Sequence, residues 1–428
     1  MVKNKSIPVT LAHINPAPFV QQVGRALSEA EMLSCFATTV ADQPQALWRN
    51  SLCNVAKLLN YNLAPQLSRR AVTEFPLSLV MTYPWREIII NLLSRVDKDK
   101  RFTDILFHWG VTGFDKWVAS QALDEVKAVY GYESGSLRTF EAARKQGIAR
   151  IYDVPSPEHD FVENLLHKEE GHFPELITPY RKYVKSLQER RTRHRRREWE
   201  LADVVIANSE FTKASYANAG LDVTKVRVIP YGAPPVCENG VTGGTKEHEP
   251  VNFLWAGTFS VRKGAHYLLQ AWKDLKPGDK AKLSVFGAMG LAPSSLQNLP
   301  DSIKFSGTVP RSQLYNHYYQ ADVLVFPTLC DGFGMVVTEA FAQGLPVITT
   351  DKAGAADLVR HGVNGLIIPA GDIDALTEAM NWCMKNRQKL RAMRQAALET
   401  AASWQWSDYR RTLVEKLLDG LKTAGYQV

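Results

Sequence analysis

Residues 323–348 combine an apolar run, a turn with two glycines and the start of a helix, VLVFPTLCDGFGMVVTEAFAQGLPVI. Gly332 and Gly334 allow the backbone of the turn to approach a ligand closely. The first N–H groups of the following helix can then point at a phosphate, helped by the helix dipole. Glu339 lies one helical turn beyond Met335, so its carboxylate faces the same pocket mouth. Since a carboxylate repels phosphate, we expect Glu339 to bind sugar hydroxyls.

A second window, residues 251–272, brings two adjacent cations to another strand-to-helix turn. It reads VNFLWAGTFSVRKGAHYLLQAW, with Arg262 and Lys263 just before Gly264. A loop of this kind can offer both cations to a diphosphate. The two windows together therefore indicate a phosphate-binding site.

Alternating strands and helices must position both windows. In the second half we expect strands and helices by their hydrophobic periods, with strands at 251–256, 282–286, 303–305, 323–327 and 346–349, and helices from 265 and at 312–319, 335–343 and 372–384. In the first half we expect strands at 8–14, 33–39, 125–132, 149–154 and 204–207, and helices at 19–32, 136–146 and after Ser209. This alternation indicates parallel sheets with helices on both faces, which bind ligands at the carboxyl edge of the strands.

The second half resembles one enzyme family. The pattern Asp331-x7-Glu339 around Gly-Phe-Gly, followed by GLPVITTD and DLVRHGVNGLIIPAGD, resembles the Glu-x7-Glu signature of retaining glycosyltransferases of family 4. The resemblance implies an α/β fold of two Rossmann-like, doubly wound domains that face a central cleft, called GT-B. It also implies that Glu339 binds the ribose of a nucleotide, that the backbone of residues 333–336 holds the diphosphate, and that Asp331 touches the transferred sugar.

The cation loop resembles the family's Gly-Arg-x4-Lys-Gly loop. Gly257, Lys263 and Gly264 are in place, and Thr258 stands where the family has arginine. Half of the usual pair of cations is therefore missing, and we expect Arg262 to substitute for it. The resemblance gives Lys263 and Arg262 the role of stabilising the leaving diphosphate.

Val309 lies in GTVPRSQLYNHYYQAD, which resembles the family segment whose main chain meets the nucleobase. The resemblance thus extends the donor site over three segments of the second half. The expected donor-binding residues are Gly257, Thr258, Arg262, Lys263, Val309, Asp331, Gly332, Phe333, Gly334, Met335, Val336 and Glu339.

The first half resembles the family more loosely. Its first strand is followed by His13 and Asn15 rather than by a glycine-rich loop, and Tyr132 and Glu133 stand where many relatives have a histidine. Either Tyr132 or Glu133 could replace that histidine. Residues that follow expected strands add further cleft candidates, so the catalytic candidates of this half are Glu133, Tyr132 and His108, and the cleft candidates are His13, Asn15, Asp153 and His159.

The formal net charge of +7 comes from one segment. Residues 181–197 hold nine Lys or Arg and one Glu, so the rest of the chain is nearly neutral. The segment has no Pro or Gly and continues with helix formers to Leu201, which predicts one basic helix. It could be a solvated helix face, a patch for anionic lipids, or a nucleic-acid site, although no nucleic-acid-binding motif accompanies it. We expect Arg190–Arg197 to attach to anionic membranes that present an acceptor.

Length and composition predict two globular domains. We expect an N-terminal acceptor-side domain at 1–235, a linker at 236–250, a C-terminal nucleotide-sugar domain at 251–404, and a C-terminal helix at 405–428 that packs back on the first domain. No apolar run suffices to span a bilayer, and the N-terminus does not resemble a signal peptide. We therefore expect a cytoplasmic protein. The widely spaced cysteines agree with a reducing compartment: Cys35, Cys53, Cys237, Cys330 and Cys383.

These features predict a glycosyltransferase that moves a sugar from a nucleoside diphosphate to a glycan, lipid-linked or small-molecule acceptor. We expect no cofactor and no metal, because the pairs Asp97/Asp99 and Asp372/Asp374 lie in a lysine-filled turn and at a helix start. A nucleotide-sugar epimerase or a phosphorylase could share this fold, but Asp331-x7-Glu339 favours transfer. An inactive protein that binds sugar nucleotides or lipids is the remaining alternative.

Overall fold

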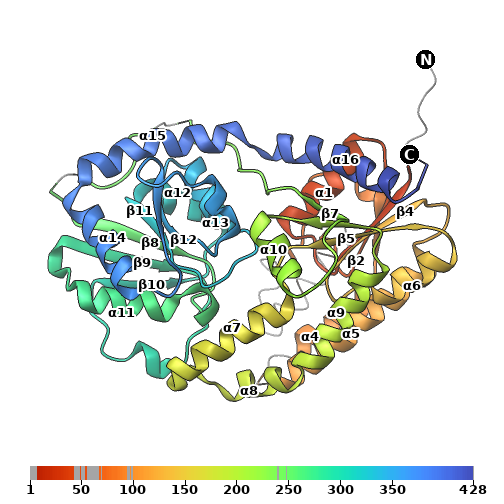
Figure 1. Cartoon of the computed structure of the whole chain (residues 1–428), viewed down its shortest axis with the longest axis horizontal. Helices are drawn as coiled ribbons and strands as arrows, with labels where there is room; N and C mark the ends of the chain where they lie inside the picture. The colour runs from red at the N-terminus through yellow and green to blue at the C-terminus, as the bar shows by residue number, and fades with distance from the viewer. Residues whose placement is uncertain are drawn as a thin grey trace.

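The computed structural model describes residues 7–42, 70–93, 100–238, 241–246 and 248–427, and residues 49, 54, 67, 68 and 97 singly. Within these residues the chain forms two parallel sheets of seven and six strands, each in its own lobe (Figure 1). Cys53 and Asp99 lie outside the described residues. None of the helices in the described part of the chain is long and apolar enough to cross a membrane.

The N-terminal sheet has the strand order β3-β2-β1-β4-β5-β6-β7, and all its pairs are parallel. The order reverses between β1 and β4, as in doubly wound folds. Its strands are β1 (Val9–Ala12), β2 (Leu33–Thr38), β3 (Val80–Thr82), β4 (Ala128–Tyr132), β5 (Ala149–Val154), β6 (Val204–Ala207) and β7 (Val226–Val228). Helices α1 (Pro18–Glu29), α6 (Leu137–Lys145) and α10 (Glu210–Asn218) connect them. Ser209 caps α10 as predicted, since its side chain accepts the N–H of Thr212.

The C-terminal sheet has the order β10-β9-β8-β11-β12-β13, again parallel throughout. Its strands are β8 (Val251–Ala256), β9 (Ala281–Phe286), β10 (Ile303–Gly307), β11 (Val323–Phe326), β12 (Val347–Thr350) and β13 (Gly365–Ile368). Its helices are α11 (Ala265–Leu275), α12 (Arg311–Gln320), α13 (Met335–Ala342), α14 (Ile373–Lys385) and α15 (Arg387–Ser403). The predicted α/β class and doubly wound sheets are confirmed.

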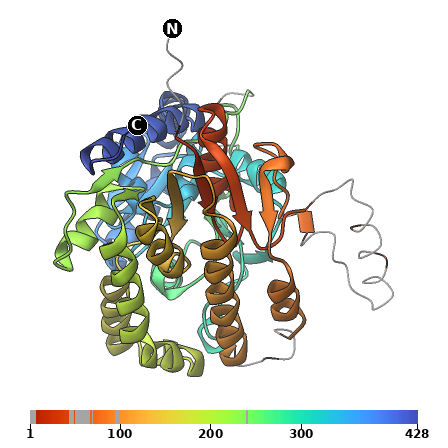
Figure 2. The ribbon, with the colours of Figure 1, turned by 90° about the vertical axis from the view of Figure 1, so that its right-hand side faces the viewer.

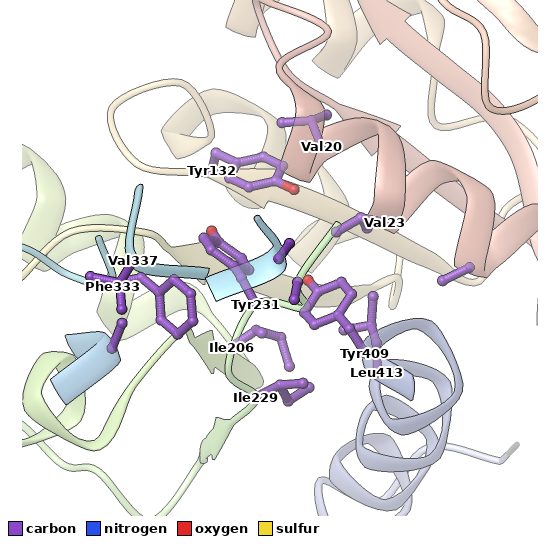
Figure 3. Close-up of a cluster of buried hydrophobic side chains, with 14 of the residues drawn as sticks. Val20, Val23, Tyr132, Ile206, Ile229, Tyr231, Phe333, Val337, Tyr409 and Leu413 are labelled. Carbon is purple, nitrogen blue, oxygen red and sulfur yellow. The ribbon is translucent and has the colours of Figure 1, made fainter. Parts of the chain in front are cut away.

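The last helix, α16 (Trp406–Thr423), returns to the N-terminal domain. In Figure 1, α15 and α16 run one after the other from one lobe to the other. α16 packs on α1, and Nε of Arg410 lies 2.8 Å from a carboxylate oxygen of Glu29. A buried apolar cluster continues through this region into the C-terminal domain (Figure 3). The two domains therefore share part of their core.

Helices α4 (Trp85–Leu93), α5 (Arg101–Gln121), α7 (His159–His172), α8 (Pro179–Ser186) and α9 (Gln188–Leu201) complete the N-terminal lobe. Figure 2 shows α4, α5 and α8–α9 extending beyond the strands at one end of this domain. The basic segment forms two helices rather than the predicted one. The break is at Leu187, whose N–H bonds to the carbonyl oxygen of Val184 in a tighter turn.

The expected strand before His108 is wrong. His108 lies in the middle of α5, and the apolar residues Ile105 and Phe107 that suggested a strand are exposed on the helix surface. These two hydrophobic side chains are exposed on a helix and are not buried in a sheet. His108 therefore does not stand at a strand end.

Candidate functional site

Two strand-to-helix turns of the C-terminal domain lie side by side, one after β8 and one after β11. Gly264 begins α11 with φ 76°, and a Cβ there would lie 1.9 Å from the carbonyl oxygen of Pro327. Gly334 begins α13 with φ 87°, and a Cβ there would lie 2.7 Å from the ring of Phe326. Both positions require glycine, because the backbone is left-handed and the neighbours are too close. The glycines therefore bring the cation loop against the turn at the end of β11.

The cations of the loop converge on Asp331. Nζ of Lys263 and Nη1 of Arg262 each lie 3.9 Å from Oδ2 of Asp331. Arg262 also donates to the carbonyl oxygen of Cys330 at 3.0 Å. Lys263 lies 5.5 Å above the ring of Phe326. Two positive charges thus stand beside the first turn of α13, where the N–H of Val337 donates to the carbonyl oxygen of Gly334 and the N–H groups of Met335 and Val336 precede it.

Glu339 is buried on α13 and held by two side chains. Arg311 of α12 donates to Oε1, and the hydroxyl of Tyr318 donates to Oε2 at 3.1 Å. Burial raises the pKa of Glu339, while the positive charges of Arg311 and Lys263 oppose this rise. The carboxylate is therefore fixed in orientation and lies within the field of the cation loop.

The turn after β11 is also the junction with the N-terminal domain. The carbonyl oxygen of Gly332 accepts the hydroxyl of Ser209 at 2.5 Å and that of Thr212 at 3.2 Å. A Cβ on Gly332 would lie 2.2 Å from the carbonyl oxygen of Pro155. The ring of Phe333 packs edge-on against Tyr231 at 5.3 Å between centroids (Figure 3). This junction places the carboxyl edges of the two sheets opposite each other.

On the N-terminal side, four of the candidates gather at the ends of β1, β4 and β5. The ring of His13 lies 4.7 Å from that of Tyr132, and Asp153 accepts the hydroxyl of Tyr130 at 2.6 Å. Glu133 accepts the hydroxyl of Tyr216 at 2.9 Å. Tyr132 belongs to the same buried apolar cluster as Tyr231 and Phe333 (Figure 3). This cluster connects the ends of the N-terminal strands with the domain junction.

The environment of this group shifts its titration. Burial raises the pKa of Glu133 to about 7, although the positive charge of Arg195 opposes the rise. Burial also raises the pKa of Asp153 to about 7. Burial lowers the pKa of His13 to about 4, so this imidazole is neutral at physiological pH. The N-terminal edge therefore holds two carboxyl groups that can gain or lose a proton near neutral pH.

The remaining predicted residues occupy varied places. Thr258 is exposed, Gly257 lies next to the ammonium of Lys263, and Val309 packs partly buried against the shared core. His159 begins α7 and its Nδ1 lies 2.7 Å from the hydroxyl of Thr192, in a setting where burial lowers its pKa to about 4. Burial lowers the pKa of His108 too, and its neighbours are Arg191 and Asp104. The rest stand at the turns already described: Asn15 after β1, and Met335 and Val336 at the start of α13.

Sequence reasoning missed the residues that hold Glu339 and Gly332 in place. Arg311 lies two positions after Val309, so the segment assigned to base binding also supplies the partner of Glu339. Tyr318 lies on α12 as Arg311 does, whereas Ser209 stands at the start of α10 in the N-terminal domain. The only local sequence pattern near these residues was Val-Pro-Arg at the start of α12, and it did not indicate that Arg311 pairs with Glu339. The pairing itself depends on the tertiary packing of α12 against α13.

Within the described residues, no three His, Cys, Asp or Glu side chains come together in a way that could hold a metal ion. Metal independence stays a prediction. The cysteines that the structure describes are free: Cys35, Cys237, Cys330 and Cys383.

Comparison with known proteins identifies the C-terminal domain. Residues 243–400 match the sequence model of the family described as glycosyl transferases group 1. We call these matched residues the group 1 domain. The cation loop, Asp331 and Glu339 all lie within the matched residues of this group 1 domain.

Curated relatives agree with this assignment. The GDP-mannose-dependent alpha-(1-6)-phosphatidylinositol monomannoside mannosyltransferase of Mycobacterium tuberculosis (strain CDC 1551 / Oshkosh) is 27% identical over 242 residues, which cover 51% of this chain and 62% of that protein. The D-inositol 3-phosphate glycosyltransferase of Corynebacterium urealyticum is 28% identical over 238 residues, which cover 50% of this chain and 56% of that protein. The chain thus spans little more than half the length of these relatives.

Solved structures extend the likeness to the whole fold. Sucrose-phosphate synthase from Thermosynechococcus elongatus has a TM-score of 0.64 at 18% identity and covers 98% of this chain and 100% of its own. HepE from Anabaena, in complex with UDP and glucose, has a TM-score of 0.60 at 15% identity and covers 96% of this chain and 99% of its own. At such low identity these matches show the fold alone. They confirm the predicted GT-B architecture, in which the group 1 domain follows a second Rossmann-like domain.

Proposed function

We propose that this protein is a retaining glycosyltransferase of family 4 that moves a sugar from a nucleoside diphosphate donor to an acceptor. The main support is the arrangement at the start of α13, where Lys263 and Arg262 meet Asp331 and the positive charge of Lys263 acts on Glu339. A diphosphate needs cations and free N–H groups, and a ribose needs a fixed carboxylate. The group 1 domain brings both together at the start of α13, from two turns that are distant in the sequence.

In this proposal the acceptor hydroxyl attacks the anomeric carbon on the face from which the diphosphate leaves. The bond from the anomeric carbon to the phosphate oxygen breaks, the bond to the acceptor oxygen forms, and the departing phosphate takes the acceptor's proton. Lys263, Arg262 and the N–H groups after Gly334 stabilise the negative charge that develops on the phosphate. Asp331 contacts a hydroxyl of the transferred sugar.

We assign the N-terminal edge to the acceptor side. Glu133, Tyr132, Asp153 and His13 lie at the carboxyl ends of β1, β4 and β5, and burial raises the pKa of both carboxyl groups to about 7. A carboxylate there can accept a hydrogen bond from an acceptor hydroxyl. No residue of this edge is needed as a nucleophile in the proposed reaction.

The names of similar proteins suggest which donor and acceptor classes to propose for this protein. Anabaena HepE is solved with UDP and glucose, and the mycobacterial relative is named as GDP-mannose-dependent and as acting on a phosphatidylinositol monomannoside. We propose a UDP- or GDP-linked hexose as donor, with no metal, and a lipid-linked or soluble sugar as acceptor. Attachment of Arg190–Arg197 to anionic membranes would bring a lipid-linked acceptor near the site.

A transfer assay tests the proposal. Wild-type protein is incubated with UDP- and GDP-sugars and candidate acceptors, and nucleoside diphosphate release and the anomeric configuration of the product are measured. We expect release with at least one donor and a product that keeps the donor's configuration. Glu339→Gln should reduce release strongly, whereas Glu399→Gln, at an exposed position of α15, should not. An inverted product would refute retention.

The second candidate is a protein that binds sugar nucleotides without transferring them. The observation that favours it is Thr258, which is exposed where the family has an arginine. In that case nucleotides would bind and neither release nor epimerisation of the donor would occur. Formation of an epimer without release would instead indicate an epimerase.

A further inference from the structure

Large apolar side chains are exposed mainly in one short part of the chain. Of the thirteen large hydrophobic residues recorded as exposed among the described residues, nine lie between Leu77 and Trp109. Five of these form what we call the α4–α5 apolar patch: Trp85 (45% exposed), Ile88 (47%), Phe102 (47%), Ile105 (54%) and Trp109 (38%). A concentration of this kind on a globular protein marks an interaction site.

The patch is continuous because two helices share it. Phe102, Ile105 and Trp109 follow the i, i+3, i+7 spacing of one stripe on α5. Trp85 and Ile88 follow the same spacing on α4, and the rings of Trp85 and Trp109 meet edge-on at 5.4 Å. The other faces of α5 are occupied, since Gly110 lies against Ile90 of α4. The stripe is thus the solvent-facing side of a packed helix pair.

Cations border the patch on the side of α8 and α9. Asp104 of α5 pairs with Arg191 at 2.6 Å, and the guanidinium of Arg101 lies 5.9 Å from the ring of Tyr183. These contacts set α5 between α4 and the basic helices, which Figure 2 shows at the same end of the domain. Exposed cations on or next to these elements include Lys100, Arg101, Lys182, Lys185 and Arg190.

The predicted arginine cluster contributes less free charge than its composition suggests. Arg196 pairs with Asp160 at 2.9 Å and Arg197 with Glu200 at 2.9 Å, and Arg193 pairs with Glu189. Arg191 is bound to Asp104. Much of the cluster therefore braces α9 against α5 and α7. An electrostatic contact made by these arginines alone would be weak and easily screened by salt.

We propose that the α4–α5 apolar patch inserts into the headgroup region of an anionic lipid membrane, with the bordering cations against the phosphates. Tryptophan, phenylalanine and isoleucine next to Lys and Arg are the composition of helices that lie in a bilayer interface. Apolar area supplies affinity there, and the cations supply the preference for anionic lipid. The patch lies outside the donor site, so membrane binding does not depend on the proposed transfer reaction.

Co-sedimentation of the full chain with vesicles tests this. Vesicles of phosphatidylcholine alone are compared with vesicles that also contain phosphatidylglycerol, in the absence of nucleotide. We expect wild-type protein to prefer the anionic vesicles. The double substitution Phe102→Ser and Ile105→Ser should weaken binding about tenfold, the effect of withdrawing two half-exposed apolar side chains from lipid. Thermal denaturation checks that this variant is folded.

Two controls separate the patch from other causes. Phe305→Ser and Val363→Ser, which remove exposed apolar side chains from the C-terminal domain, should leave binding unchanged. The triple substitution Arg190→Gln, Arg193→Gln and Arg197→Gln should weaken binding to anionic vesicles. This loss should be smaller than the loss caused by the patch variant. Unchanged binding of the patch variant, or loss confined to the arginine variant, would overturn the proposal. So would a wild-type dimer that the patch substitutions dissociate and that binds no vesicles, because the patch would then join two copies of the chain. None of these outcomes would alter nucleotide release in the transfer assay.

Discussion

Glu339 and Glu133 stand at the carboxyl edges of two similar parallel sheets, yet their surroundings differ. Glu339 is bonded to the guanidinium of Arg311 and to Tyr318, and Lys263 adds a second positive charge. Glu133 accepts a hydrogen bond from the neutral hydroxyl of Tyr216, and its pKa rises to about 7. The C-terminal edge is thus built on ion pairs, and the N-terminal edge on hydroxyls and carboxyls.

This difference matches the tasks that we propose for the two edges. A permanent cation beside a carboxylate suits the binding of a sugar nucleotide, whose esterified diphosphate keeps its charge near neutral pH. A carboxyl group that titrates near neutral pH can lose its proton to accept a hydrogen bond from an acceptor hydroxyl. The comparison therefore predicts that substitutions in the two domains affect different quantities.

The largest effect should come from Lys263. Lys263→Ala removes a cation from the leaving diphosphate, and we expect kcat/KM to fall by about 100-fold or more, as for other groups that stabilise developing charge. Thermal stability should change little, because the side chain lies at the site and not in the core. Steady-state nucleotide release measures the effect, with Lys273→Ala on the exposed face of α11 as control. Equal activity of the two variants would show that Lys263 does not stabilise the leaving diphosphate.

Arg311 should have a smaller effect, confined to donor binding. Arg311→Gln leaves Glu339 without its guanidinium partner, and hydrogen bonds to charged groups contribute about 1.5–3 kcal/mol. We expect KM for the donor to rise about tenfold or more while kcat changes less. Arg360→Gln, at an exposed position of the same domain, serves as the matched control. A loss in kcat with unchanged KM would contradict a positioning role for Arg311.

The titration of Glu133 at the N-terminal edge should make the stability of the protein depend on pH. The folded-state pKa of Glu133 is about 7 and the ordinary value is 4.5. The folded state therefore binds this proton more tightly, and stability should be lost as pH rises from 4.5 to 7. At about 1.4 kcal/mol per pKa unit, the loss reaches about 3 kcal/mol.

Urea denaturation at pH 5 and pH 8 measures this loss. Glu133→Gln cannot titrate, so its free energy of unfolding should fall less between the two conditions than that of wild type. The charge of Glu133 also raises the pKa of Asp153, so the difference between the two proteins reports the titration of Glu133 together with its coupling to Asp153. Parallel pH profiles would show that Glu133 titrates alike in the folded and unfolded states.

The smallest effect should come from Asp331, where the family has glutamate. Asp331→Glu lengthens the side chain by about 1.5 Å, one carbon–carbon bond. We expect the preference among donor sugars to shift a few-fold while nucleoside diphosphate affinity stays constant, because in the proposed site the carboxylate contacts the sugar. Competition between two donors with one nucleotide base measures this directly. An equal change for every donor would contradict the assignment.

Local patterns in the sequence predicted the strands and helices around the candidate donor site. Lys263 and Glu339 each lie in a short window where strand, glycine turn and helix follow one another, so spacing alone indicates their position. Strands β5, β6 and β8 occupy the predicted residues for the same reason. These features depend on neighbours in the chain, which a sequence shows.

Features that depend on distant elements escaped prediction. The bond from Arg311 to Glu339 joins two helices, and Ser209 bonds to Gly332 across the domain junction. The apolar residues Ile105 and Phe107 suggested a strand in the sequence, although they are exposed on α5. Composition showed the charge of the arginine cluster but not the carboxylates that pair with it.

The most direct test of the donor site is a thermal shift with UDP and GDP on wild type, Lys263→Ala and Glu339→Gln. A ligand at 100 times its dissociation constant adds about 2.7 kcal/mol to the stability of the protein. We expect at least one of the two diphosphates to raise the melting temperature of wild type and to lose most of that effect in both variants. The Lys273→Ala control should respond like wild type. If neither diphosphate stabilises wild type, or if both variants respond as wild type does, the proposed donor site at the start of α13 is wrong.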